Sequence, residues 1–598
     1  MGSPRKTKEV PFLRPVSPQR IFLVIGTVFG LIFLFITPPF QVADEPQHFY
    51  CAYLVSELGF FRLVELNKDE KPLGNEWSTI GASLPSSLAY LVDGSDMVSV
   101  HKQGHRKIQV DRITSLMSLP LYPGRREYLP VAPYPPIAYF PQATGMALGR
   151  FVGLPPLVLF YLGRLFALAA WIGIVYLAIK KTPLLKWTFC LLALMPMTLS
   201  LAPSLSSDSL TSGISFLLIA YLLFLAYDKR KSTVNRQDIY TLFFLSIILA
   251  LCKAVYVPLV FMFFLIPTSK FESKKKYFLT FASVLTAGIA AYLIWGYLVS
   301  TVIGPGPTIS LERHAVDSPP FSNVSRPEQV AFILSHPGHL VDVLVNTVSI
   351  FWSYLLNTFV GLLGWVDTWL PSWIPYVYIA ALVGVAFLDD STEMVSLKAR
   401  LFSLAIFSGI VFASLFYIYT GWNSVGADLV EGFQGRYLIP IAPAFFFALG
   451  KSNFKPKTRR WIPSAVISFS IIILSTTVYS VVERFYLETP LTFTIDQLEY
   501  TKDDFVFIKG WAIDRTSDST ASAVLVNIDG KSYQMRYGGD RSDVASVMNK
   551  PSYRYSGFEA RIPADEIGKG RHALYLEVVT RNRNSYEVPK RKVIFKLD

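Results

Sequence analysis

Cysteine is scarce in this sequence, and its scarcity excludes two kinds of protein. Only three cysteines occur among 598 residues, and two of them, Cys190 and Cys252, lie within apolar segments. A disulfide-stabilised domain needs paired cysteines, and a structural zinc site needs closely spaced Cys and His ligands. The sequence contains neither pattern, so we expect no disulfide framework and no metal site of this kind.

The sequence also lacks a signal-peptide cleavage site and internal repeats, and its charge pattern is not that of a nucleic-acid-binding protein. The first apolar run, residues 21–36, is followed by Thr37-Pro38-Pro39 instead of a small-residue cleavage site, so we interpret it as a retained span. No internal repeat is visible, whereas many transporters are built from repeated halves. Net charge is +13, but the basic residues form short blocks between apolar runs, which is typical of membrane topology. We therefore expect no nucleic-acid partner.

Apolar residues dominate what is present. Hydrophobic residues make up 52% of the chain and the mean hydropathy is +0.39. Several apolar runs are long enough to cross a bilayer, which predicts an α-helical polytopic membrane protein. Basic residues within 1–20 indicate a cytoplasmic tail, and the remaining basic blocks predict about eleven spans across residues 21–488. We expect a multi-pass protein of the cytoplasmic (inner) membrane, with long outer segments at residues 39–156 and 302–372.

Some apolar segments are simple spans, whereas others are predicted to be broken or to lie outside the membrane core. Residues 239–267 are best explained as two short helices broken near Cys252–Tyr256, because one long span would place later basic blocks outside. Residues 45–61 predict an amphipathic helix. Residues 134–152 predict a helix that lies at the membrane surface or is re-entrant, and residues 338–360 predict a helix at the membrane surface. The other spans are expected near 21–38, 157–179, 184–202, 208–227, 277–301, 373–388, 400–419, 437–450 and 461–484.

The composition changes near residue 490. Residues 490–598 are polar, with short alternating apolar runs such as Ala523 to Ile528 and an Asp529-Gly530 hairpin signal. This pattern predicts a C-terminal β-sandwich, and an odd number of spans would place it outside the cytoplasm. Its aromatic residues have two open interpretations, stacking on sugar rings or packing in the core: Trp511, Tyr533, Tyr537 and Tyr553.

Adjacent carboxylates follow the first span, in the stretch Pro38 to Phe49. Ionisable groups at the mouth of a span are costly unless they serve a site or face water. Asp44 and Glu45 are therefore candidate functional residues. The alternative is a solvated loop in which Asp44 caps a helix beginning at Glu45-Pro46.

Topology gathers further polar residues on the same outer side. Lys253 is the most informative, because a charge within apolar sequence usually pairs or serves a site. Asp208 could instead cap a span, Arg164 could pair or snorkel, and the residues at 431, 434 and 436 could form a solvated helix face. The complete outer set is Asp44, Glu45, His48, Tyr134, Asp208, Lys253, Tyr256, Arg313, His314, Glu431, Gln434, Arg436 and Tyr437.

This combination favours one reaction, glycosyl transfer from a lipid-phosphate sugar. Lys253 and Arg436, with Arg313 as a third candidate, would neutralise the phosphate. Asp44 or Glu45 would deprotonate the acceptor hydroxyl, and the shorter Asp44 side chain is our preferred base. We expect the other carboxylate to orient a neighbour such as Lys253 or His48. The substrate-contacting candidates are His48, Tyr134, Asp208, Tyr256, Glu431, Gln434 and Tyr437.

The same residues carry a family resemblance over roughly residues 20–480. The segments Asp44-Glu45-Pro46-Gln47-His48-Phe49, Tyr134-Pro135-Pro136, Lys253-Ala254-Val255-Tyr256 and Gln434-Gly435-Arg436-Tyr437 resemble the GT-C superfamily of membrane glycosyltransferases, and more closely a bacterial family of uncharacterised polytopic proteins within it. The resemblance implies a polyprenyl-phosphate sugar donor, an inverting reaction and a catalytic acid at Asp44-Glu45. We expect a glycan or polymer acceptor, contact with membrane lipid, and no cofactor or essential metal.

Three alternatives remain open. The enzyme could be a polysaccharide polymerase or ligase that uses a lipid-diphosphate oligosaccharide. It could instead be a lipid-sugar transporter or flippase, although a transporter should show repeated halves and polar residues at mid-membrane depth. A non-catalytic scaffold that displays the C-terminal domain is the third.

Overall fold

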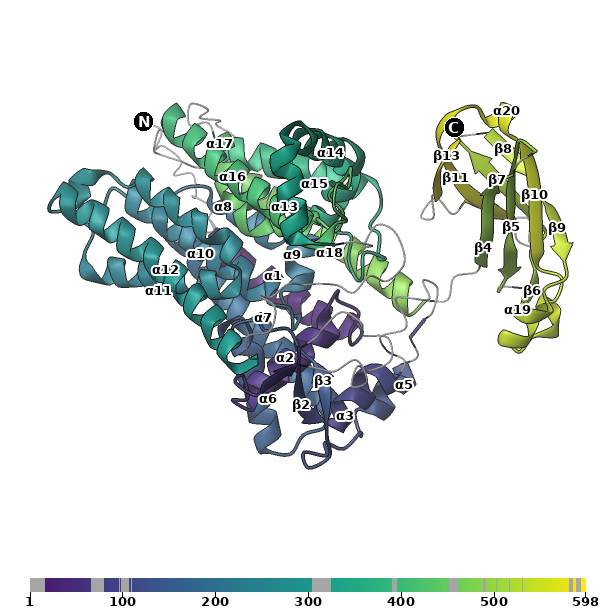
Figure 1. Cartoon of the computed structure of the whole chain (residues 1–598), viewed down its shortest axis with the longest axis horizontal. Coiled ribbons are helices and arrows are strands. Elements are labelled where there is room, and N and C mark those ends of the chain that lie inside the picture. Colours follow the sequence, from purple (N-terminus) through teal and green to yellow (C-terminus); the bar gives the residue numbers. More distant parts are fainter. Residues whose placement is uncertain are drawn as a thin grey trace, which may run out of the picture. The chain divides into compact units, whose positions relative to one another are not determined.

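The computed structural model divides the chain into two compact units, residues 1–482 and 483–598. Figure 1 labels the helices and strands of both units. The residues that the structure describes are 17–65, 80–95, 97, 107–108, 110–303, 324–389, 395–450, 461–487, 491–501, 503–515, 517–529, 531–579, 585–587 and 593–597.

The first unit is helical, as its apolar runs predict. Seven helices in the described ranges are long and apolar enough to cross a membrane by length and composition. They are α1 (Pro18–Ile36), α7 (Pro156–Lys181), α10 (Asp208–Tyr227), α12 (Lys274–Ile303), α14 (Pro337–Val360), α16 (Leu397–Trp422) and α18 (Ile462–Phe485). The membrane-helix prediction is confirmed, whereas the count of about eleven spans stays a prediction.

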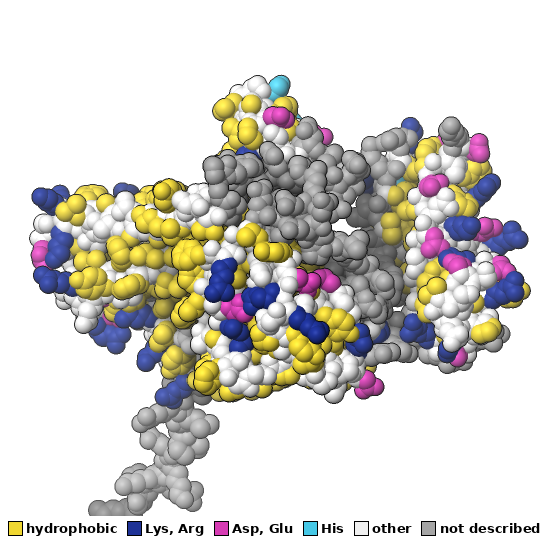
Figure 2. Space-filling model, turned by 60° about the horizontal axis from the view of Figure 1, so that its bottom comes forward, with side chains coloured by type: hydrophobic (Ala, Val, Ile, Leu, Met, Phe, Trp, Pro, Cys, Tyr) yellow, Lys and Arg dark blue, Asp and Glu magenta, His cyan; other side chains and the backbone are white. Residues whose placement is uncertain are grey.

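The surface of this unit has the pattern expected of a membrane protein. Figure 2 shows hydrophobic side chains over much of the left part of the view, with Lys and Arg gathered at its left tip. Along α12, for example, Phe278, Leu293 and Tyr297 are exposed. An apolar helix with exposed apolar side chains needs a nonaqueous environment.

Some predicted elements differ from those observed. Residues 184–202 form two short helices, α8 (Lys186–Ala193) and α9 (Pro196–Leu201), because Pro196 cannot continue the first. Helix α14, predicted to lie on the surface, is one of the seven of spanning length. Residues 134–152 form η3 (Pro136–Tyr139) followed by α6 (Phe140–Phe151) instead of one helix. Proline again sets the boundaries.

The predicted break near Cys252–Tyr256 is present. Helix α11 (Arg236–Cys252) ends there, and the 3₁₀ helix η4 (Ala254–Leu265) follows. Lys253 reaches Asp208 at the start of α10, whereas the Lys270 Nζ atom donates to the Leu225 carbonyl at its end, 2.7 Å away. The chain therefore returns along α10 within η4, and a 3₁₀ helix rises about 2.0 Å per residue, more than an α-helix does.

Helix α2 (Glu45–Ser56) follows α1 and is shorter than predicted. We expected an amphipathic helix, but His48 to Val55 are all buried, so that prediction is wrong. The reason is that α2 packs against α6 and against a small antiparallel sheet that the sequence did not predict. That sheet has the order β1 (Leu63–Glu65), β2 (Ile80–Pro85), β3 (Arg126–Pro130). α3 (Ser86–Ala89), η2 (Tyr90–Gly94) and α5 (Val110–Leu116) complete this segment.

Four shorter helices in the described ranges lie among the long helices α12 to α18. Helix α13 (Arg326–Ser335) precedes α14, and α15 (Trp373–Leu388) follows it. The 3₁₀ helix η6 (Gly435–Ile441) runs directly into α17 (Ala442–Leu449). Because η6 begins immediately after an irregular loop, residues 431 and 434 are not on a helix. The interpretation of positions 431, 434 and 436 as one solvated helix face is therefore wrong.

The second unit confirms the predicted C-terminal β-sheet region. One sheet has the order β4-β5-β10-β9 with β6 beside β5, and the other has the order β12-β11-β7-β8 with β13 beside β11. Side chains from both sheets share one buried core, which includes Ile508, Val526 and Leu576. The strands are β4 (Leu491–Tyr500), β5 (Phe505–Asp514), β6 (Ser519–Thr520), β7 (Ala523–Ile528), β8 (Lys531–Gln534), β9 (Arg536–Gly539), β10 (Gly557–Pro563), β11 (Gly570–Val579), β12 (Ser585–Glu587) and β13 (Val593–Leu597).

Alternating apolar residues place one face of β5, β7, β10 and β11 in this core. The hairpin between β7 and β8 pairs Ile528 with Lys531, and Asp529 has φ +50° as the tight turn requires. The four aromatic candidates pack on cores: Tyr533 and Tyr537 lie against the shared core, and Trp511 and Tyr553 join a smaller cluster. Of their two open interpretations, core packing accounts for these side chains.

Candidate active site

Four charged side chains from distant parts of the sequence meet at one end of the helical unit. They come from the loop after α1, the start of α10, the end of α11 and the start of η6. Lys253 forms an ion pair with Asp208. The Arg436 guanidinium lies 3.6 Å from the Asp44 carboxylate and 4.0 Å from that of Asp208. The structure thus brings together two of the three candidate phosphate ligands, Lys253 and Arg436, and two candidate carboxylates.

Asp44 is the accessible member of this cluster. Its side chain is 58% exposed, whereas that of Arg436 is only 7% exposed. Asp44 occupies the N-cap position of α2, but its side chain makes no capping hydrogen bond, and its φ of +62° is left-handed. A non-glycine residue held in this conformation is strained, and such strain concentrates at functional sites. The capping interpretation therefore fails to account for the Asp44 side chain.

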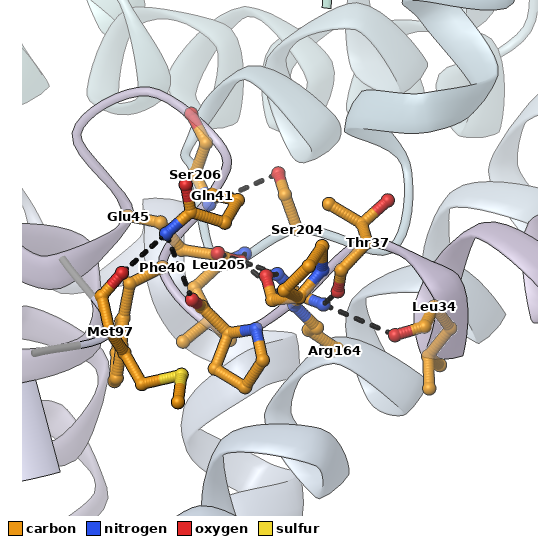
Figure 3. Close-up of polar contacts among 12 residues, drawn as sticks. Leu34, Thr37, Phe40, Gln41, Glu45, Met97, Arg164, Ser204, Leu205 and Ser206 are labelled. Atoms are coloured by element: carbon orange, nitrogen blue, oxygen red, sulfur yellow. Dashed lines mark hydrogen bonds and ion pairs between the residues drawn. The ribbon is translucent and has the colours of Figure 1, made fainter. Parts of the chain in front are cut away.

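Glu45 has a different environment, which Figure 3 shows in close-up. Its carboxylate is fully buried and pairs with Arg164 at 2.6 Å, and it also accepts a hydrogen bond from the Leu205 N–H. The Arg164 guanidinium donates to three backbone carbonyls at the end of α1, those of Leu34, Thr37 and Pro38. We expected the second carboxylate to orient Lys253 or His48, and that expectation is wrong because Arg164 is its partner.

This buried pair joins three parts of the chain. It links the α1 end, α7 and the loop before α10, so it fixes the backbone that carries Asp44. Two buried amides support the same region: Gln41 donates to the Met97 carbonyl at 2.6 Å (Figure 3), and Gln142 donates to the Ser206 carbonyl at 3.4 Å. Asp44 therefore projects from a rigid support.

Tyr437 lies against both cations. The Lys253 Nζ atom is 5.2 Å from the centre of its ring and the Arg436 guanidinium carbon is 5.4 Å from it. Cations are attracted to an aromatic face at such distances. The Tyr256 hydroxyl donates to the Tyr437 carbonyl at 2.7 Å, which joins η4 to η6. Tyr256 and Tyr437 thus hold the cations in place.

Glycine allows η6 to approach α14 closely. A Cβ atom on Gly435 would lie 2.0 Å from the Leu355 carbonyl oxygen and 2.5 Å from the Phe359 nitrogen. The Gly435 N–H also donates to the Thr358 hydroxyl at 2.8 Å. Only a residue without a side chain fits here, and it sets the position of the neighbouring Arg436.

An aromatic group borders the charges. His48 on α2 shares a 2.8 Å hydrogen bond with the Tyr139 hydroxyl, and its ring centre lies 6.2 Å from that of Tyr134. Burial lowers the pKa of His48 from 6.5 to about 4, although the nearby Asp44 and Asp208 carboxylates oppose this change. His48 is therefore neutral near pH 7. Tyr134 is 43% exposed, so its ring remains accessible from the site.

The other predicted site residues have different positions. Arg313 and His314 lie outside the described residues. Glu431 and Gln434 lie in the loop before η6, and burial raises the pKa of Glu431. Trp365, which the sequence did not mark as a site residue, donates to the Phe40 carbonyl at 2.9 Å. A single tryptophan beside a glycine gives no signal that would have predicted this contact.

Metal binding has no evident site in the described ranges. No group of three or more His, Cys, Asp or Glu side chains there is arranged to hold a metal ion. The pairs Asp44–Arg436 and Asp208–Lys253 already match each carboxylate with a cation. The expectation of a metal-independent site stays a prediction.

Comparison with known sequences identifies a family. The family described as "Predicted membrane protein (DUF2142)" matches residues 27–445, which include all four charged residues of the cluster. The match covers more than half of the chain, so the chain belongs to this family, and it is a membrane protein with several apolar helices. No curated protein and no solved structure matches the chain.

Proposed function

We propose that this member of the DUF2142 family is a GT-C-type glycosyltransferase. It moves a sugar from a polyprenyl-phosphate donor to a cell-envelope glycan or polymer at the outer face of the cytoplasmic membrane. The observation that carries the proposal is the exposed Asp44 carboxylate beside the buried Arg436 guanidinium, 3.6 Å apart. At that separation, one group can take the proton of the acceptor hydroxyl while the other stabilises the leaving phosphate in the same displacement reaction.

The reaction uses these groups as follows. The acceptor hydroxyl oxygen forms a bond to the anomeric carbon while the bond from that carbon to the phosphate oxygen breaks. The hydroxyl proton passes to Asp44, and the electron pair of the broken bond remains on the phosphate. The leaving polyprenyl phosphate gains one negative charge, which Lys253 and Arg436 stabilise.

Glu45 is not the base in this proposal. Its carboxylate is fully buried and bound to Arg164, so an acceptor hydroxyl cannot reach it without breaking that pair. Asp44 is accessible and is held by a left-handed backbone conformation. The environments of two adjacent carboxylates thus assign them to different tasks, as in other acid and base pairs.

The aromatic side chains and the C-terminal unit supply the remaining functions. Tyr134 presents an exposed ring near the charges and is suited to stack on a sugar. The C-terminal sheets form a unit with its own core, and we assign it to acceptor binding. Figure 2 shows both signs of charge over the surface of this unit, which suits a polar polymer.

The test is direct. The purified protein is incubated in detergent or vesicles with cell-envelope material and a panel of radiolabelled donors, which contains polyprenyl-phosphate sugars and a lipid-diphosphate oligosaccharide, and the product is identified. Transfer from a polyprenyl-phosphate sugar supports the proposal. Transfer only from a lipid-diphosphate oligosaccharide would replace it with the polymerase or ligase hypothesis. Movement of the lipid across vesicles without transfer would replace it with the flippase hypothesis.

A further inference from the structure

Asp208 lies beside the two cations, Lys253 and Arg436, that would bind the donor phosphate. Its carboxylate forms an ion pair with Lys253 and lies 4.0 Å from the Arg436 guanidinium, so a phosphate bound to these cations would compete with it. It is the first residue of α10, whose N-terminal end favours an anion. Its side chain is 16% exposed and that of Lys253 is 24% exposed, so a ligand can reach the pair.

Arg436 is incompletely satisfied in this arrangement. Its Nε–H is buried and has no hydrogen-bond partner among the residues that the structure describes. The two carboxylates at 3.6 and 4.0 Å are farther away than the roughly 2.7–2.9 Å of a charge-assisted hydrogen bond. A buried donor without a partner is costly, and a ligand oxygen placed between the cations would satisfy it.

The charges of the four-residue cluster also balance. Two cations, Lys253 and Arg436, face two carboxylates, Asp44 and Asp208. A phosphodiester donor adds one negative charge, and Asp44 must stay ionised to act as a base. The carboxylate that can give up its partner is therefore Asp208.

We propose that Asp208 is the resident counter-ion of the donor site, which pairs with Lys253 when the site is empty and is displaced by the donor phosphate. This role rests on the proposed function. After transfer the leaving phosphate carries one more negative charge than the donor and binds the cations more strongly. Asp208 then competes for Lys253 and promotes product release. It acts as a positioning residue, because it touches no reacting atom.

The experiment measures binding of farnesyl methyl phosphate, a prenyl phosphodiester, to the full-length protein. Asp208→Asn removes the competing charge and should lower the Kd by about tenfold, whereas Lys253→Met should raise it by a similar factor. Asp208→Glu keeps a carboxylate and should restore the wild-type Kd. Asp208→Ser is a second neutral variant that replaces the amide if Asp208→Asn does not fold. Asp238→Asn is the matched control, since Asp238 pairs with Lys231 at 2.6 Å.

The possible outcomes separate the two proposals. Tighter binding by the neutral variants supports the counter-ion role, because loss of a merely structural contact would weaken binding. Unchanged or weaker binding in a folded Asp208→Asn or Asp208→Ser protein overturns it and leaves the donor site intact. Failure of the wild-type protein to bind the phosphodiester contradicts the lipid-phosphate donor itself. With the identified donor, the neutral variants should also show a product burst followed by slower turnover, with kcat and KM both reduced.

Discussion

The Glu45 carboxylate and the Arg164 guanidinium form a 2.6 Å ion pair in which both side chains are at most 1% exposed. Removing one partner leaves the other charge buried and unpaired, which costs about 3–5 kcal/mol. Glu45→Gln and Arg164→Met should each lower the free energy of unfolding by this amount, measured by thermal unfolding in detergent. The double variant should lose less than the sum, because the two residues interact directly.

An exposed pair provides the control for this prediction. Glu272 pairs with Lys276 at 2.6 Å but is 81% exposed, so Glu272→Gln should change stability by less than about 0.5 kcal/mol. Equal effects of Glu45→Gln and Glu272→Gln would show that the buried pair does not stabilise the fold.

Asp44→Asn tests the catalytic base. The amide keeps the shape of the side chain but cannot accept the acceptor proton, so single-turnover transfer should fall by about 10²–10⁴-fold. Binding of the donor should change little, because Lys253 and Arg436 remain. Asp111→Asn is the matched control, as Asp111 on α5 is an exposed carboxylate outside the cluster.

A second comparison separates the adjacent carboxylates. Glu45→Gln should lower the amount of folded protein, while the molecules that do fold should retain most of their transfer rate. Normal transfer by Asp44→Asn together with inactive, fully folded Glu45→Gln would reverse the two assignments.

The sequence predicted which charged residues form the site, but it did not predict the pairing of Glu45 with Arg164, and the difference has a physical reason. Asp44, Asp208, Lys253 and Arg436 each stand at the edge of an apolar run, and the alternation of runs and basic blocks places such edges on one side of the membrane. Hydropathy alone could therefore group them. Which charge pairs with which depends on helix packing. For that reason Arg164 was not predicted as the partner of Glu45.

Local signals explain the remaining successes and errors. The alternating runs in the C-terminal unit predicted β7 over Ala523–Ile528, where period-two burial follows directly from the residues. Helix α2 was mispredicted because its burial on all sides comes from α6 and the β1-β2-β3 sheet, whose short strands have no strong pattern. The break near Cys252–Tyr256 was predicted from the basic blocks, but the break before Pro196 and the 3₁₀ conformation of η4 were not, because hydropathy reports neither.

His48 makes stability depend on pH. Burial lowers its pKa from 6.5 to about 4, so between these values the unfolded chain binds a proton that the folded chain does not. The free energy of unfolding should therefore fall as the pH falls from 6.5 toward 4, and no such contribution exists above 6.5. His48→Gln should reduce this dependence, measured as Tm in detergent, whereas the exposed His336→Gln should not. Parallel Tm curves for the wild type and His48→Gln would contradict the assignment.

Gly435→Ala tests the close contact between η6 and α14. The added Cβ would lie 2.0 Å from the Leu355 carbonyl oxygen, so η6 must shift and carry Arg436 with it. We expect a loss of stability of about 1–3 kcal/mol and at least about tenfold weaker binding of a prenyl phosphodiester. Gly409→Ala is the control, because a Cβ at Gly409 on α16 meets nothing within 4 Å. Unchanged phosphodiester affinity in Gly435→Ala would show that this contact does not set the position of Arg436.

Removal of the C-terminal unit separates donor chemistry from acceptor binding. The four charged residues all lie in the first unit, and the second has its own buried core. A chain ending at Leu487 should therefore still insert into membranes and bind a prenyl phosphodiester with the wild-type Kd. If the C-terminal sheets bind the acceptor, this chain should transfer sugar to the native polymer at least about tenfold more slowly, with the loss mainly in the KM for polymer. Transfer to a small soluble acceptor should be unaffected, which provides the internal control. A truncated chain that modifies the native polymer at the full rate would remove the acceptor role from this unit, and the sheets would then require another explanation.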